Sequence, residues 1–285
     1  MDDRRAPRTT RGGEQPGAPG AVADDPHILF QNVHFWHGPT RILDGVSFQV
    51  PRGRITVVLG PSGTGKSTLL WLMLGLWTVD GGRILLDGRD TTSFTERDWK
   101  EARRNLSMVF QENALFDSLT VGENVGYAML QSGDVAAADV ERKVRETMQL
   151  VELDPDRFID RMPDQLSGGQ KRRVAIARAI AACDPEAILY DEPTTGLDPG
   201  TARRIGNLIL KLRHRHGTTS VVVTHEIADA LRVGDHFILL EGGKVLYEGD
   251  AAGLLASDHP GVRGFLEPFL RSIDEIAPKV GEALR

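Results

Sequence analysis

A glycine-rich segment over residues 60–67 has the residue types and spacing of a phosphate-binding loop. Its sequence, GPSGTGKS, fits the pattern G-x-x-x-x-G-K-[ST]. Glycines let consecutive backbone N–H groups point inward at phosphate oxygens, and the following helix directs its positive end at them. A glycine turn before a helix is the alternative, but the flanking apolar segments favour nucleotide binding. The expected nucleotide contacts are Gly60, Pro61, Ser62, Gly63, Thr64, Gly65, Lys66, Ser67 and Thr68.

Within this loop, two side chains have distinct chemistry. Lys66 would place a cation beside the β- and γ-phosphates, and the hydroxyl of Ser67 can be a ligand of Mg²⁺. A second metal ligand has to come from a neighbouring strand. Asp191 ends the apolar run of residues 187–190 and fits that requirement, and Glu192 would then point at the γ-phosphate as a general base. Acidic residues often end strands at a protein surface without any catalytic role. The assignment of Asp191 and Glu192 to metal binding and catalysis therefore depends on the phosphate-binding loop in the same chain.

Two further polar residues follow apolar runs. His225 comes directly after residues 220–224 and could hydrogen-bond the γ-phosphate and the attacking water. A lone histidine at a strand end is more often structural or merely exposed. Gln111, in the segment MVFQENALF, is unremarkable by itself.

The elements that must position these side chains form an alternating α/β pattern. Residues 55–59, ITVVL, are a continuous β-branched apolar run, which predicts a strand buried on both faces, as in a parallel sheet. A helix is expected from Lys66 onward. Further strands are expected at residues 28–33, 46–50, 187–190 and 220–223, with a hairpin at 237–240 and 244–247.

A polar, helical block interrupts the α/β pattern. Residues 135–153 carry apolar positions at helical spacing, which predicts one buried stripe, and a second helix is expected at residues 170–182. The stripe consists of Val140, Val144, Met148 and Val151.

The composition along the sequence divides the chain into three segments. Residues 1–26 read as a disordered tail, residues 27–255 as the folded domain with the helical block at about 112–185, and residues 256–285 as a C-terminal extension with an apolar helix at 262–273. The apolar run of residues 69–79 is shorter than the roughly 20 residues that span a bilayer, so a buried helix is expected there. No signal peptide is expected.

The overall charge argues against one class of partner. The 285-residue chain has a net charge of −6, whereas general affinity for nucleic acid usually needs a basic face. Cys183 is the only cysteine, which excludes an internal disulfide.

Residues 166–170 read LSGGQ, with Ser167 as a helix cap and two small glycines that allow close approach. This sequence resembles the signature motif of the ABC ATPases, and the resemblance covers about residues 28–250. It implies an α/β P-loop NTPase core of the RecA-like type, with an inserted α-helical subdomain and a small antiparallel β subdomain. It also implies that Gln111 is the glutamine that contacts the metal and the catalytic water. The signature residues Ser167, Gly168, Gly169 and Gln170 would contact nucleotide.

The resemblance implies roles for the remaining motif residues. Asp191 would be the Mg²⁺-side acid, Glu192 the catalytic base and His225 the switch histidine. One position departs from the family pattern, because the usual aromatic platform for adenine is replaced by His37. We expect the adjacent Trp36 to provide that platform, the alternative being that one of these aromatic residues packs in the core.

In the ABC family the signature motif faces the nucleotide held by a second cassette. The resemblance therefore implies a homodimer with two ATP molecules, bound with Mg²⁺, between head-to-tail partners. It also implies transmembrane permease subunits, possible small regulatory and substrate-binding subunits, and a peripheral location on the cytoplasmic face of the inner membrane. No nucleic-acid partner is expected.

The segment after Gln111 reads ENALFDSLTVGENV, which is similar to the ATPases of the Mla/Mce phospholipid transport systems. Residues 50–56 and 262–266 also resemble that group. Amino-acid importers and lipoprotein-release ATPases share much of this surface and remain alternatives. The C-terminal extension could brace a neighbouring cassette, bind a regulatory partner or pack on its own domain.

Soluble ABC ATPases are the remaining class. Ribosome-acting members usually carry two cassettes in one chain, and DNA-repair members carry a long coiled coil, for which no heptad run is present here. Iron–sulfur assembly ATPases tend to lack the full set of hydrolytic residues. A nucleotide-binding scaffold without activity is disfavoured by the presence of both Glu192 and His225.

Overall fold

The computed structural model describes residues 25–132, 135–181 and 184–283. Residues 1–24, which form nearly all of the expected N-terminal tail, and Cys183 lie outside the described residues. Side chains are described up to residue 273, with residue 132 excepted.

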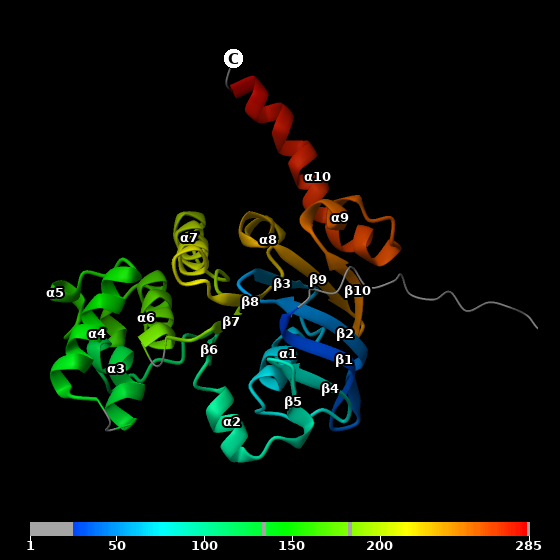
Figure 1. Ribbon diagram of the computed structural model, residues 1–285. Helices are drawn as coiled ribbons and strands as arrows, with labels where there is room; N and C mark the ends of the chain where they lie inside the picture. The colour runs from blue at the N-terminus through cyan, green and yellow to red at the C-terminus, as the bar shows by residue number, and fades with distance from the viewer. Residues whose placement is uncertain (1–24, 133–134, 182–183, 284–285) are drawn as a thin grey trace, which may run out of the picture.

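A six-stranded sheet lies at the centre of the described chain (Figure 1). Strands β9, β3, β8, β7 and β6 pair in parallel, and β10 pairs antiparallel with β9, which confirms the expected hairpin. Parallel strands end at one edge of a sheet, which is where α/β proteins bind ligands. In spatial order the strands are β10 (Lys244–Gly249), β9 (His236–Glu241), β3 (Ile55–Leu59), β8 (Thr219–Thr224), β7 (Ala187–Asp191) and β6 (Leu106–Val109).

The central strands of this sheet are buried on both faces. In β3, Ile55, Val57 and Leu59 enter one hydrophobic core, whereas Val58 enters the other. Because side chains alternate across a strand, a continuous apolar run is needed to fill both cores. The prediction made from residues 55–59 is therefore confirmed.

A second, four-stranded antiparallel sheet has the order β2, β1, β4, β5. Its strands are β1 (Pro26–His37), β2 (Thr40–Pro51), β4 (Gly81–Leu86) and β5 (Arg89–Asp90). The first two are much longer than the expected strands at 28–33 and 46–50. Their pairing continues to His37 and Thr40, and the alternating residues Val33 and Phe35 of this part of β1 are buried in the core.

The apolar run at residues 69–79 was predicted to be one buried helix, and that prediction is wrong in extent. Helix α1 covers Lys66–Met73 only. Gly75 has a φ of +63°, and a Cβ there would lie 2.2 Å from the Trp99 ring, so the chain turns away from the helix at this point. The leucine that follows is 54% exposed.

Four helices form a group beside β6 and β7 (Figure 1). They are α3 (Val121–Ser132), α4 (Ala137–Leu150), α5 (Pro155–Phe158) and α6 (Gly168–Ala181), and α3, α4 and α6 pack on one another. All members of the predicted stripe are at most 5% exposed, so the helical periodicity identified the packed face of α4 correctly.

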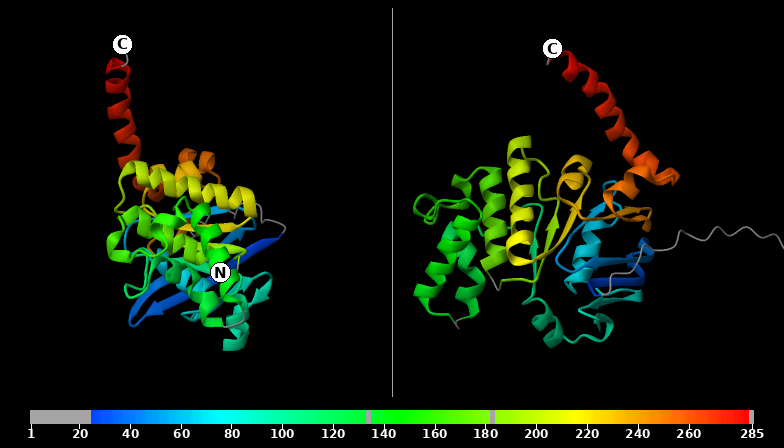
Figure 2. Two further views of the ribbon diagram at one scale, coloured as in Figure 1. Left: turned by 90° about the vertical axis from the view of Figure 1, so that its left-hand side faces the viewer. Right: turned by 45° about the horizontal axis from the view of Figure 1, so that its top comes forward.

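The remaining helices cover the two faces of the central sheet or extend from it. Helices α7 and α8 share a core with the helical group, whereas α1 packs on the opposite face. Helix α10 runs away from the sheets in both views of Figure 2. None of the helices in the described residues is long and apolar enough to cross a membrane. The bounds are α2 (Glu96–Ala102), α7 (Pro199–His216), α8 (Ile227–Val233), α9 (Ala251–Ala256) and α10 (Pro260–Ala283).

His27 joins the two sheets and gives the fold a predictable pH dependence. Its Nδ1 lies 2.9 Å from Thr219 Oγ1, and the residue is 4% exposed. Burial lowers the pKa of His27 below its ordinary value of 6.5, an effect that Asp87 opposes and Arg52 reinforces. Below about pH 6.5 the unfolded chain therefore binds more protons, and the free energy of unfolding falls as the pH decreases.

We expect His27→Gln to flatten this dependence, because glutamine can bond Thr219 without binding a proton. Urea unfolding measured between about pH 7.5 and pH 5 should give a shallower loss of stability than in the wild type. His214→Gln, at an exposed position, is the control and should follow the wild-type curve. Identical slopes for the wild type and His27→Gln would contradict the assignment.

Candidate functional site

The loop between β3 and α1 is held in place by close backbone approaches. A Cβ on Gly60 would lie 2.2 Å from Leu240 O, and a Cβ on Gly65 would lie 2.7 Å from Ile42 Cγ2. Both glycines have positive φ, at +155° and +93°. Only glycine fits these two positions, because atoms of β9 and β2 lie too close to the place that a Cβ would occupy.

The start of α1 is suited to an anion. The first N–H groups of a helix have no partner within the helix, and Gly65 at the N-cap provides no side-chain acceptor for them. These donors, together with the positive end of the helix dipole, fit the phosphates of a nucleotide.

Lys66 lies folded over the loop. Its Nζ donates to Gly60 O and Pro61 O, each at 2.9 Å, and the residue is 6% exposed. Burial lowers the pKa of Lys66, an effect opposed by Glu192 and Asp191. An ammonium group has three donors, so one remains for a phosphate oxygen.

Ser67 and Asp191 meet at the carboxyl edge of the sheet. Ser67 Oγ donates to Asp191 Oδ1 at 3.0 Å, joining α1 to the end of β7. Burial raises the pKa of Asp191, and the hydrogen bond from Ser67 lowers it. A hydroxyl and a carboxylate are hard oxygen donors, and this donor set fits Mg²⁺.

Gln111 lies at the end of β6 and is exposed. It lines a pocket of about 500 Å³ together with Asp191, Trp71 and residues 112–115. The structure thus brings Gln111 and the carboxylate of Asp191 to one cavity, although they are 80 residues apart in sequence.

Glu192 and His225 lie side by side. His225 Nδ1 is 3.0 Å from Glu192 Oε1, and Thr195 Oγ1 donates to Glu192 Oε2 at 2.8 Å. The backbone of Glu192 has a φ of +47°, a conformation that costs a non-glycine residue about 1–2 kcal/mol. A hydrogen bond from Glu192 N to Val223 O at 2.9 Å helps to hold it. The carboxylate is fixed in position, as a general base must be.

Sequence reasoning missed Thr195, which orients the Glu192 carboxylate, and Arg172, whose guanidinium donates to Gln111 O at 2.6 Å. For Thr195 the only signal was its position three residues after Glu192. For Arg172 there was none, because its contact connects distant segments.

The signature turn begins helix α6. Gln170 N donates to Ser167 Oγ at 3.3 Å and Ser167 N donates to Gln170 Oε1 at 2.8 Å, so Ser167 caps the helix as the sequence predicted. A Cβ on Gly169 would lie 2.3 Å from Thr201 Cγ2, which requires a small residue where α6 meets α7. Ser167 and Gly168 are exposed, so the turn is open to a second molecule.

The aromatic residues near the end of β1 divide between core and surface. Phe35 is 7% exposed and stacks on Trp77 at 5.1 Å between ring centroids, so it packs in the core. The His37 ring lies 5.4 Å from Trp77. Trp36 is half-buried, with the Arg41 guanidinium 4.8 Å from its ring centroid. Trp36 as the adenine platform stays a prediction.

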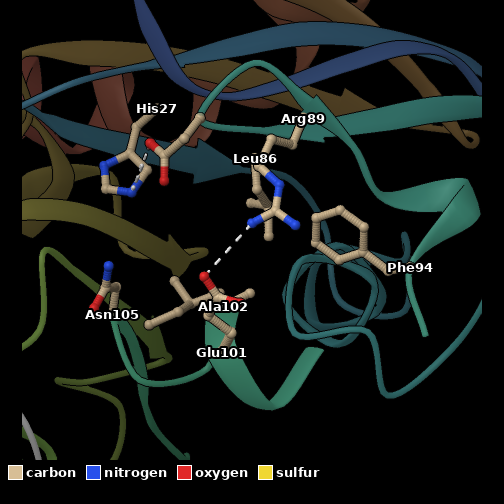
Figure 3. A pocket seen from close by; sticks show the side chains of 9 residues that line it. His27, Leu86, Arg89, Phe94, Glu101, Ala102 and Asn105 are labelled. Carbon is tan, nitrogen blue, oxygen red and sulfur yellow. Dashed lines mark ion pairs between the residues drawn. The ribbon is translucent and has the colours of Figure 1, made fainter. Parts of the chain in front are cut away.

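A smaller pocket of about 80 Å³ lies beside His27, and Arg89, Phe94 and Asn105 also line it (Figure 3). His27, Asp87 and Glu186 offer ligand atoms within 4.8 Å of one another. The Arg52 guanidinium pairs with both carboxylates, so these residues form an ion-pair network that joins the sheets. None of the residues expected to bind nucleotide lines this pocket.

Comparison with known proteins places this site in a family. Residues 43–195 match the family described as ABC transporter. The chain is 39% identical over 243 residues to the probable sulfate/thiosulfate import ATP-binding protein CysA of Chlorella vulgaris, covering 85% of this chain and 98% of that protein. It is 38% identical over 240 residues to the intermembrane phospholipid transport system ATP-binding protein MlaF of Escherichia coli strain K12, covering 84% and 88%.

A solved structure has the same fold. The ATP-binding cassette MJ0796, a dimer in a post-hydrolysis state bound to ADP and Pi, matches with a TM-score of 0.71 and 35% identity. The match covers 78% of this chain and 98% of that chain. The cassette fold expected from the motifs is therefore confirmed, and the chain belongs to the ABC transporter family as an ATP-binding, ATP-hydrolysing cassette.

Proposed function

We propose that this cassette powers an ABC transporter that moves phospholipid or another hydrophobic lipid, as the Mla/Mce systems do. The observation that carries the transporter part of this proposal is the surface after Gln111. Phe116 is 41% exposed, and its sequence neighbours Leu115 and Asp117 line the 500 Å³ pocket. An exposed apolar side chain between two residues that line a pocket suits contact with a short helix from a membrane subunit.

The similarity to MlaF supports a lipid cargo, but other relatives are named for different cargoes. Among them are proteins named for the import of sulfate, Fe(3+) ions and sn-glycerol-3-phosphate. An importer of a small solute is therefore the second candidate function.

The proposed hydrolysis uses the side chains that meet at the sheet edge. Lys66 and the N–H groups at the start of α1 hold the β- and γ-phosphates and stabilise the charge that develops on them. Glu192 accepts a proton from the attacking water, and His225, beside it, orients that water. Mg²⁺, held by Ser67, Asp191 and Gln111, would supply neutralising charge at the phosphates.

We propose that two copies bind two ATP molecules head to tail, with residues 167–170 of each facing the nucleotide of the other. ATP closes this dimer and hydrolysis releases it, which is a ligand-driven population shift. The permease subunits would hold the cassettes at the cytoplasmic face of the inner membrane, with small regulatory or substrate-binding subunits as further partners. Residues 27–255 would be the cassette and residues 256–285 an extension for docking or bracing.

Phe116→Asp tests the docking surface. We expect the tagged wild type, purified from detergent-solubilised membranes of its own host, to carry a multi-spanning protein with it. The Phe116→Asp variant should lose at least about 10-fold of that protein, because the substitution removes the apolar ring and would place a charge in the contact. Val135→Asp, at an exposed valine between α3 and α4, is the control. Equal recovery in all three would contradict the docking surface, and recovery of only soluble partners would overturn the transporter assignment.

The cargo is tested on the recovered complex. Reconstituted in vesicles, it should transfer a fluorescent phospholipid to acceptor vesicles only when ATP is hydrolysed. Uptake of a small solute such as sulfate without lipid transfer would favour the second candidate.

A further inference from the structure

Both oxygens of the Glu192 carboxylate have a hydrogen-bond partner. Oε1 lies 3.0 Å from Nδ1 of His225, and Oε2 accepts a hydrogen bond from Oγ1 of Thr195 at 2.8 Å. The terminal torsion of a glutamate side chain is broad, so a single bond leaves the carboxylate free to turn. Two bonds, one to each oxygen, fix the plane of the group and hence the direction of its remaining lone pairs.

The histidine is the less firmly held of the two partners. The side chain of His225 is 38% exposed, and its other nitrogen, Nε2, lies 3.4 Å from an oxygen of the exposed Glu226. In the proposed mechanism this ring also orients the attacking water. Its bond to Glu192 therefore changes as the ring turns, and it does not by itself hold the carboxylate in one direction.

Thr195, in contrast, belongs to the short turn between β7 and α7. Of the two residues that separate it from Glu192, the first is Pro193, whose ring fixes φ. Leu197 N donates to Thr194 O at 3.2 Å within the same turn. Thr195 is half-buried, and its branched Cβ restricts χ1. The hydroxyl donor is thus presented to the carboxylate from a nearly fixed position.

The backbone of Glu192 is fixed from the other side. Its N–H donates to Val223 O, on β8, at 2.9 Å. With the main chain bonded to β8 and Oε2 bonded to Thr195, little freedom remains for the side chain. The hydroxyl uses only one lone pair of the carboxylate, so others are left to accept the proton of a water molecule.

From these contacts we propose that Thr195 is a positioning residue for ATP hydrolysis, whose hydroxyl directs the carboxylate of Glu192 at the attacking water. Thr195 acts through Glu192 and needs no contact with nucleotide or metal. The inference rests on the proposed function, because it takes Glu192 as the general base.

Thr195→Val tests this role, because valine has the shape of threonine without the donor. We expect kcat for ATP hydrolysis to fall about 5- to 10-fold, since the base loses one hydrogen bond to its charged group and is no longer directed at the water. KM and the equilibrium affinity for ATP should keep their wild-type values, which is the pattern of an interaction that acts only in the transition state. Thr195→Ser keeps the donor and should recover at least about half of the wild-type kcat.

Thr147→Val is the matched control for the loss of a buried hydroxyl. Thr147, on α4, is 3% exposed, and its Oγ1 donates to Lys143 O at 2.7 Å. The same chemical change is therefore made in the helical group, away from the phosphate-binding loop. The thermal midpoint of this variant should fall, whereas its kcat should equal that of the wild type.

Combining Thr195→Val with Glu192→Gln separates positioning from a general structural role. Glutamine accepts no proton, so its direction no longer affects the rate, and Thr195→Val should cause no further loss of the residual hydrolysis. A structural role would give the same fold-loss in both backgrounds. Single-turnover hydrolysis of radiolabelled ATP measures these slow rates.

A wild-type kcat in a folded Thr195→Val chain would overturn the role, as would an equal loss in Thr147→Val or in the Glu192→Gln background. Thr195→Ala, which also lacks the donor, replaces the valine variant where that chain does not fold. Where the chain alone turns over too slowly, the same variants are compared in the complex recovered with its membrane subunits. Failure of the proposed base gives a different result, namely wild-type hydrolysis in Glu192→Gln alone.

Discussion

Glu192→Gln is expected to lower steady-state ATP hydrolysis by at least about 100-fold while ATP binding is retained. A positioned general base contributes about 10²–10⁴ in rate, and glutamine cannot accept the proton of the attacking water. Glutamine has the same shape, and its amide can still bond Thr195 and His225, so the local structure should persist. Phosphate release and equilibrium binding of a fluorescent ATP analogue measure the two quantities.

The same variant should accumulate as an ATP-bound dimer on size exclusion, because closure requires ATP and release requires hydrolysis. Glu226→Gln is the matched control. This neighbouring acid lies 3.4 Å from His225 Nε2 and is about half exposed, so its loss should leave hydrolysis within a few-fold of the wild type. A wild-type hydrolysis rate in Glu192→Gln would mean that the base lies elsewhere, and an equal loss in Glu226→Gln would move the role to that residue.

Lys66→Met is expected to weaken ATP binding about 10- to 100-fold and to reduce hydrolysis further. Hydrogen bonds to charged groups contribute about 1.5–3 kcal/mol, and the ammonium is the cation nearest the β- and γ-phosphates in the proposed mechanism. Methionine preserves the packing of the buried stem, so the loss should come from the charge. Isothermal titration with ATP gives the affinity, and phosphate release gives the rate.

Lys100→Met, at an exposed lysine of α2, is the control for the loss of one positive charge. The thermal midpoint of Lys66→Met also has to be measured, because Lys66 bonds Gly60 O and Pro61 O in the loop. A folded Lys66→Met chain that binds ATP as tightly as the wild type would contradict the placement of the phosphates at this loop.

Local sequence determined much of the fold. The run of residues 55–59 predicted a strand buried on both faces, and the spacing of Val140, Val144 and Met148 predicted the packed face of α4, because each is a periodicity of neighbouring residues. The glycines of residues 60–65 predicted the loop for the same local reason. The length of β1 was not predicted, although β1 pairs with β2 across a short turn from His37 and Thr40 back to Pro26 and Pro51. The end of α1 at Met73 was not predicted because it depends on the approach of Trp99, from another segment, to Gly75.

For the candidate site, too, some features were determined by the sequence and others only by the tertiary structure. The sequence alone determined which residue types were available: a lysine and a serine after a glycine loop, two acids after one strand and a histidine after another. Only the tertiary structure decided that Glu192 shares a hydrogen bond with His225, that Ser67 bonds Asp191, and that Arg172 holds the loop of Gln111. These contacts depend on parallel strands that end at one edge of the sheet and on helices packed beside it. Such pairings join residues far apart in the chain, and no local pattern encodes them.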